Sequence, residues 1–130
     1  ASLGYQADCV VTPDVTGAAR PTPFMLFECM RRLGVYPPQA VVKVGDTVVD
    51  MQEGKNAGAW SIGILTGSNL LGLSQAEYDA MPAELLERRK RETAERYRQA
   101  GADLVIDSIR ELPQAIGQIN RRMEQGEAAK

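Results

Sequence analysis

Histidine is absent from the 130-residue sequence, and cysteine and aromatic residues are scarce. Without histidine the chain cannot itself supply a Ser-His-Asp triad, a histidine-rich zinc site or an imidazole general base. No apolar run approaches the roughly 20 residues of a membrane-spanning helix, so we expect no membrane partner. The formal net charge of −2 offers no basic surface, so we expect no nucleic-acid partner either.

The two cysteines, Cys9 and Cys29, have neither the spacing of a Cys-x-x-Cys motif nor a histidine to pair with. The first residues lack the basic start and apolar core of a signal peptide, so we expect a cytoplasmic protein. In a reducing compartment, the two thiols are expected to be packed side chains rather than a disulfide or a catalytic thiolate.

The pattern of apolar residues predicts a single α/β domain. Hydrophobic residues make up 44% and charged residues 25% of the chain, which is typical of a globular protein. Strands are predicted at 8–12, 41–44, 60–65 and 104–106, a loop at 14–21, and helices at 23–33, 47–57, 74–100 with a break near Pro82, and 112–123. Strands that alternate with helices indicate a Rossmann-like parallel sheet with flanking helices.

The segment from Val41 to Asp50 carries the strongest functional signal. A β-branched run predicts a buried strand that ends at Gly45-Asp46, and Asp50 follows about one helical turn later. Ligands of open α/β sheets bind at the carboxyl ends of the strands, so both carboxylates are expected to face one crevice. Mg²⁺ suits such a pair because it commonly takes one or two carboxylates together with water and phosphate oxygens. Arg20, in an earlier loop at the same edge, could hold anionic oxygens with its planar guanidinium.

Taken alone, the Gly-Asp-x-x-x-Asp pattern is weak, because it also suits a helix cap followed by a solvated acid. Lys43 lies next to this pattern, and a buried lysine can serve as a Schiff-base amine. Neighbouring residues of a strand point to opposite faces, however, so we expect a structural role for Lys43.

Several short motifs occur in a fixed order: Arg20-Pro21-x-Pro23-x-Met25, Leu33-Gly34-Val35-Tyr36-Pro37, Val42-Lys43-Val44-Gly45-Asp46-Thr47 with Asp50, Glu53-Gly54, Asn56-Ala57-Gly58, Gly67-Ser68 and Leu71-Gly72-Leu73. With them, residues from about 4 to 121 resemble the carboxyl-terminal half of phosphonoacetaldehyde hydrolase (phosphonatase), in the haloacid dehalogenase superfamily. The Gly-Asp-Thr-x-x-Asp motif is shared across that superfamily, whereas the Arg-Pro-x-Pro-x-Met and Leu-Gly-Val-Tyr-Pro motifs are much more specific.

The resemblance implies a haloacid dehalogenase-like core with an inserted cap, and hydrolysis of the carbon–phosphorus bond of phosphonoacetaldehyde to acetaldehyde and phosphate. It implies a nucleophilic aspartate, a cap lysine that forms a Schiff base, and Mg²⁺. On this sequence it implies that Asp46 is the Mg²⁺ carboxylate, that Asp50 supports it, and that Arg20 neutralises the nucleophile and the phosphoryl group. Thr47 and Asn56 are implied to shape loops.

The sequence also departs from the family. It contains no Asp-x-Asp, so the nucleophile is missing, as are the phosphate-gripping threonine loop and the cap; Ala19 replaces a usual glycine and Thr22 a common aromatic residue. We therefore interpret 1–124 as the carboxyl-terminal part of the core domain, without its first strand and cap, and 125–130 as a frayed tail. The missing strand would leave an apolar edge beside Val41–Val44 that promotes association.

We thus expect this chain alone to be inactive, and the complete enzyme to be a homodimer that acts on a small phosphonate. Two alternatives remain open. One is a haloacid dehalogenase-type phosphatase that acts on a phosphate monoester, and the other is a non-catalytic module that binds Mg²⁺ or phosphate.

Overall fold

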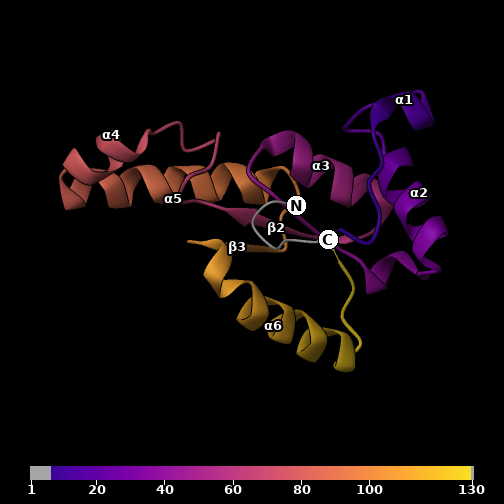
Figure 1. Cartoon of the computed structure of the whole chain (residues 1–130). Coiled ribbons are helices and arrows are strands. Elements are labelled where there is room, and N and C mark those ends of the chain that lie inside the picture. The colour runs from indigo at the N-terminus through magenta and orange to yellow at the C-terminus, as the bar shows by residue number, and fades with distance from the viewer. Residues whose placement is uncertain (1–6, 130) are drawn as a thin grey trace.

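A parallel three-stranded sheet with helices on both faces makes up the computed structural model, which describes residues 7–129 (Figure 1). The strands are β1 (Val42–Gly45), β2 (Trp60–Ile64) and β3 (Leu104–Ile106), in that spatial order. The helices are α1 (Pro13–Thr16), α2 (Phe24–Leu33), α3 (Val48–Ala57), α4 (Gln75–Ala80), α5 (Ala83–Gln99) and α6 (Leu112–Glu124), with short 3₁₀ turns at Pro38–Ala40 and Ile109–Glu111. The predicted fold class, an α/β parallel sheet with flanking helices, is confirmed.

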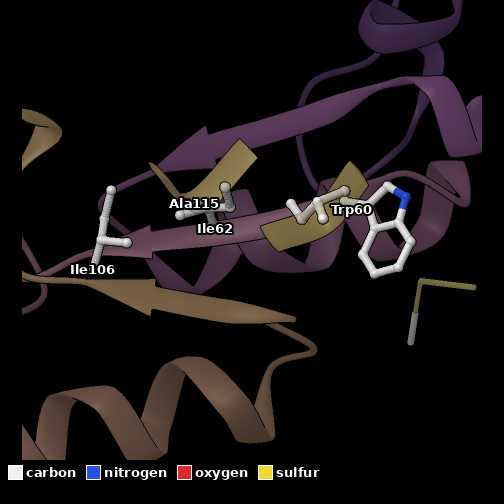
Figure 2. Packing of buried hydrophobic residues seen from close by; sticks show 5 residues of the cluster. Trp60, Ile62, Ile106 and Ala115 are labelled. Atoms are coloured by element: carbon white, nitrogen blue, oxygen red, sulfur yellow. The ribbon is translucent and has the colours of Figure 1, made fainter. Parts of the chain in front are cut away.

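One face of the sheet packs against α6. Trp60 and Ile62 alternate along β2, so both side chains point to this face, where they contact Ile106 of β3 and two residues of α6, Ala115 and Ile119. Figure 2 labels four of these residues and shows the Trp60 ring at one end of the row and Ile106 at the other. This apolar layer holds the three strands at a fixed distance from α6.

The other face packs against α3 and α5, and it requires small residues in β2. The Ser61 hydroxyl donates to the carbonyl of Met51 in α3 at 3.3 Å. A Cβ atom on Gly63 would lie 2.6 Å from the Tyr97 ring, so glycine permits the close approach of α5. The Tyr97 hydroxyl donates to the Ile64 carbonyl at 2.6 Å, which ties α5 to the end of β2.

Helix boundaries follow local capping signals. Thr47 caps α3 through a capping box with Asp50, and Gly58 ends α3 with a left-handed φ of 78°. Ser74 and Glu77 form the capping box that was predicted for the helix after Leu73. The predicted break near Pro82 separates α4 from α5.

Three predictions about local structure are wrong. Residues 8–12 form no strand, because a short apolar run needs a neighbouring strand, and Val10 is 69% exposed. The loop expected at 14–21 contains part of α1, which begins at Pro13, a residue suited to the first helical turn. Pro23 is the cap of α2 rather than its first helical residue.

The burial predicted for the strand at 41–44 is also wrong, since all four residues of β1 are only half-buried. β1 pairs with β2 on one side, and no strand lies on its other side in the part of the chain that the structure describes. The proposed division of the chain at residue 124 stays a prediction. Among residues 7–129, no helix is long and apolar enough to cross a membrane.

Candidate functional site

A cleft of about 890 Å³ lies at the carboxyl ends of the three strands. Asp46 follows β1, residues 66–68 follow β2, and Ser108 follows β3, so each strand contributes to its wall. Arg20 reaches the same cleft from the loop between α1 and α2. The structure therefore brings together Arg20, Asp46 and Asp50, the three residues that the sequence predicts to share a site.

Asp50 organises one wall of the cleft. Its carboxylate is almost fully buried, and Oδ2 accepts hydrogen bonds from the backbone N–H groups of Asp46 at 3.1 Å and Thr47 at 3.2 Å. The Thr47 hydroxyl donates to the same oxygen at 2.9 Å. Oδ1 forms an ion pair with the Arg20 guanidinium. Since these contacts occupy both oxygens, Asp50 holds the Asp46 and Arg20 loops in place.

Hydrogen-bond donors and nearby cations together keep Asp50 ionised. Burial by itself would raise the pKa of this carboxyl group, but its neighbours outweigh burial and hold the pKa below its ordinary value. In order of size, they are the Thr47 hydroxyl, the Arg20 guanidinium, the Lys43 ammonium group and the Asp46 backbone N–H. Asp50 is therefore an anion at neutral pH.

A buried ion pair lies behind Asp50. Lys43 Nζ is 2.9 Å from Glu53 Oε1 and 3.6 Å from Asp50 Oδ1, and Glu53 is only 2% exposed. Sequence reasoning expected a structural role for Lys43 but missed its contact with Asp50. The sequence holds no local signal for this contact, because it depends on α3 packing against the face of β1 that carries Lys43 and Gly45.

Asp46 is the carboxylate that remains available to a ligand. Its Oδ2 accepts a long hydrogen bond of 3.4 Å from the Asn69 N–H, and its carbonyl accepts one of 3.1 Å from Leu70. The loop after β2 thus fixes the Asp46 backbone and leaves most of its carboxylate unpaired. Gly45 is required beside it, because a Cβ atom there would overlap Asp50.

The donor set fits Mg²⁺ better than a metal that needs several protein ligands. Within residues 7–129, no group of three or more histidine, cysteine or acidic side chains could enclose an ion. Asp46 offers a single carboxylate at the cleft, and Mg²⁺ is commonly held by one or two carboxylates with waters and phosphate oxygens.

The Arg20 loop is anchored to α3 at a second point. The Asn56 side-chain amide donates to the carbonyl of Pro21 at 2.7 Å. Together with the Arg20–Asp50 ion pair, this bond holds the loop against both ends of α3. The contacts of Thr47 and Asn56 agree with the loop-shaping roles implied for them.

Comparison with known proteins gives consistent matches. The family model for HAD-hydrolase-like proteins, the haloacid dehalogenase-like hydrolases, matches residues 17–112. The chain is 49% identical over 119 residues to a phosphonoacetaldehyde hydrolase of Parabacteroides distasonis. The aligned region covers 92% of this chain and 45% of that protein. It is 47% identical over 120 residues to a phosphonoacetaldehyde hydrolase of Bacteroides fragilis, with 92% and 46% covered.

A solved structure has the same fold over nearly the whole of this chain. The crystal structure of a phosphonoacetaldehyde hydrolase-like protein from Oleispira antarctica superposes with a TM-score of 0.92 at 30% identity, over 98% of this chain and 46% of that one. The chain thus spans somewhat less than half the length of the relatives that it matches. From its fold, its cleft and these matches, the chain belongs to the haloacid dehalogenase-like hydrolase family.

Proposed function

We propose that this chain is the part of a phosphonoacetaldehyde hydrolase that binds Mg²⁺ and the phosphoryl group of the substrate. The overall reaction would be the hydrolysis of phosphonoacetaldehyde to acetaldehyde and phosphate. The observation that carries the proposal is the convergence of Arg20, Asp46 and Asp50 on one cleft at the ends of the strands. The names of the relatives support the substrate.

Each residue of the cleft would have a distinct task. Asp46 would ligate Mg²⁺ through its free oxygen, and Mg²⁺ there would offset charge on the phosphoryl oxygens. Arg20 would donate to the same phosphoryl group, since its side chain is 44% exposed although its guanidinium contacts Asp50. Asp50 would hold both groups in position. The nucleophile and the Schiff-base lysine would come from the part of the full-length protein that this chain does not span.

A direct assay tests the substrate. A full-length protein that contains this chain should release acetaldehyde and phosphate in equal amounts from phosphonoacetaldehyde, and less phosphate from common monoesters. Phosphate release from monoesters without activity on the phosphonate would favour the phosphatase alternative. No turnover of either substrate class would favour a non-catalytic module.

Asp46→Asn tests the metal ligand. The substitution removes a ligand charge, so the Mg²⁺ concentration for half-maximal activity should rise at least tenfold. Asp79→Asn is a matched control, because Asp79 is an exposed acid on α4. An unchanged Mg²⁺ dependence in Asp46→Asn would remove Asp46 from the metal site.

Arg20→Lys tests the phosphoryl contact. A lysine keeps the charge but cannot reproduce the planar donor pair, so kcat/KM should fall at least tenfold. Arg31→Lys, on the exposed part of α2, is the control. Wild-type kinetics for Arg20→Lys would exclude Arg20 from the site.

The free edge of β1 supports the proposal that a further strand completes the sheet in the full-length protein. The Val41 carbonyl accepts from Trp60 at 3.0 Å, so the backbone groups of Val42 and Val44 turn to the outer side of β1. Such an edge pairs readily with another chain. The chain alone should therefore be inactive and should associate, and a monodisperse monomer in light scattering would contradict this expectation.

A homodimer of the full-length protein is a further part of the proposal. Phe24 and Phe27 of α2 are 51% and 40% exposed, and Val15 of α1 is exposed nearby. Aromatic residues are enriched at protein interfaces, which supports an assembly through this face. Phe24→Asp should then convert a dimer into a monomer on size-exclusion chromatography, and a dimer that persists would argue against this face.

A further inference from the structure

Two thiols that lie 20 residues apart in the sequence meet at the surface of α2. The Sγ atoms of Cys9 and Cys29 are 3.9 Å apart, and both residues are half-buried free cysteines. Cys29 is part of α2, whereas Cys9 lies in the stretch before α1. Neither residue lines the cleft, so the proposed hydrolase site does not account for the pair.

Little movement is needed to join the two sulfur atoms. A disulfide requires a separation of about 2.05 Å, so the atoms must approach by roughly 2 Å. The stretch around Cys9 can supply this movement, because it belongs to no helix or strand and Val10 is largely exposed. Its contact with α2 includes a long hydrogen bond of 3.4 Å from Arg32 to the Val10 carbonyl. Cys29, in contrast, is held by α2, whose Met30 is buried.

We propose that Cys9 and Cys29 are a reversible modification site, at which a small disulfide such as oxidised glutathione converts the two thiols into an intramolecular disulfide. The thiolate of Cys9 attacks a sulfur atom of oxidised glutathione, which forms a mixed disulfide and releases one glutathione thiolate. Cys29 then loses its proton and attacks the Cys9 sulfur, which releases the second glutathione. The two protons lost by the protein thiols balance those gained by the two glutathione thiolates.

The environment of the pair supports this order of steps. Burial, and after it the neighbouring Cys9 thiol, raise the pKa of Cys29, so Cys29 is the poorer first nucleophile. Once Cys9 carries glutathione, the Cys29 sulfur is already adjacent to the bond that it must attack. The second step is therefore intramolecular and fast compared with attack by another molecule.

The disulfide would act on the loop that carries Arg20. It closes a ring that contains α1, the Arg20 loop and part of α2. The loop is already fixed to α3 through the Arg20–Asp50 ion pair and the bond from Asn56 to Pro21. Closing the ring reduces the conformations open to the unfolded segment, so the oxidised form should hold this loop more firmly.

Peptide mass spectrometry tests the proposal without any assumption about catalysis. Reduced protein is incubated with oxidised glutathione, blocked with iodoacetamide and digested with trypsin. Trypsin does not cleave before proline, so the Arg20-Pro21 bond survives and one peptide ending at Arg31 contains both cysteines. We expect this peptide to form the disulfide, which is two hydrogen atoms lighter than the dithiol form, and to return to the dithiol form with a reductant. The amount of the disulfide form should exceed that of the glutathione adduct of the same peptide at least tenfold.

Cys29→Ser is the matched control, and it should accumulate the glutathione adduct on Cys9 because no second thiol is in reach. A persistent adduct in the wild-type protein, disulfide-linked dimers, or an unchanged peptide mass would each overturn the proposal.

Amide hydrogen exchange of residues 17–23 measures the effect on the loop. The exchange rate should fall at least threefold when the wild-type protein is oxidised, and it should stay unchanged in Cys29→Ser. Equal exchange rates in the oxidised and reduced wild-type protein would refute the coupling to Arg20.

Discussion

Replacing Asp50 with asparagine should destabilise the fold far more than replacing any exposed acid. Asparagine has nearly the same shape, so it leaves no cavity and removes mainly the negative charge. That charge strengthens three hydrogen bonds to Oδ2, two from backbone N–H groups and one from Thr47, and each loses about 1 kcal/mol when the acceptor becomes neutral.

The ion pairs of Asp50 add a smaller amount. Arg20 is 44% exposed, so solvent screening limits its share to about 0.5 kcal/mol. Lys43 is less exposed, but it keeps Glu53 as a partner at 2.9 Å. We therefore expect Asp50→Asn to lower the free energy of unfolding by about 3–4 kcal/mol, a large fraction of the 5–15 kcal/mol typical of a domain.

Urea unfolding followed by tryptophan fluorescence measures this loss, because Trp60 is the only tryptophan and is fully buried. Asp79→Asn makes the same chemical change at an exposed site and should cost less than about 0.5 kcal/mol. Equal losses in the two variants would refute the role given to Asp50.

The pH dependence follows from the lowered pKa of Asp50. A carboxyl group whose folded pKa lies below the ordinary value of 3.8 stabilises the fold at any pH above that value. This contribution disappears as the pH falls through the folded pKa. The stability difference between wild type and Asp50→Asn should therefore be constant from pH 5 to 7 and should shrink below about pH 4; a difference that grows with acid would contradict the direction of the shift.

Two further substitutions probe the packing behind the cleft. Gly63→Ala would place a Cβ atom 2.6 Å from the Tyr97 ring, so it should cost about 1–3 kcal/mol in urea unfolding, and an unchanged midpoint would show that α5 has room to move. Lys43→Met leaves Glu53 as an unpaired buried charge and should cost about 3–5 kcal/mol, whereas adding Glu53→Gln should recover at least 1 kcal/mol of that loss. A double variant less stable than Lys43→Met would contradict the ion pair.

Features that depend on a few neighbouring residues could be predicted from the sequence. The capping boxes at Thr47 and Ser74 and the left-handed Gly58 fix helix ends by local hydrogen bonds, so α3 ends at the predicted Ala57, and α3 and α4 each begin one residue after the predicted 47 and 74. The strand at 104–106 agrees in both bounds, because the turn residues on either side of it are local signals too.

Features that depend on distant neighbours could not be predicted in the same way. Residues 8–12 have the composition of a strand, but a strand exists only where another strand pairs with it. The half-exposed state of β1 likewise depends on which strand lies beside it. The contact between Lys43 and Asp50 requires knowing that α3 covers the Lys43 face of β1, which no single segment reveals.

The two aspartates of the motif divide stability and ligand binding between them. Asp50 is buried, carries three hydrogen bonds on one oxygen and pairs with a guanidinium on the other, so its removal disturbs the fold before it disturbs any ligand. Within residues 7–129, the side chain of Asp46 makes one long hydrogen bond of 3.4 Å, so Asp46→Asn should change stability by less than about 1 kcal/mol. A metal ligand can be tested by mutation only where the fold tolerates the change, and Asp46 meets that condition whereas Asp50 does not. If Asp46→Asn instead unfolds at the same urea concentration as Asp50→Asn, the carboxylate of Asp46 is part of the scaffold and cannot be assigned to the metal from activity loss alone.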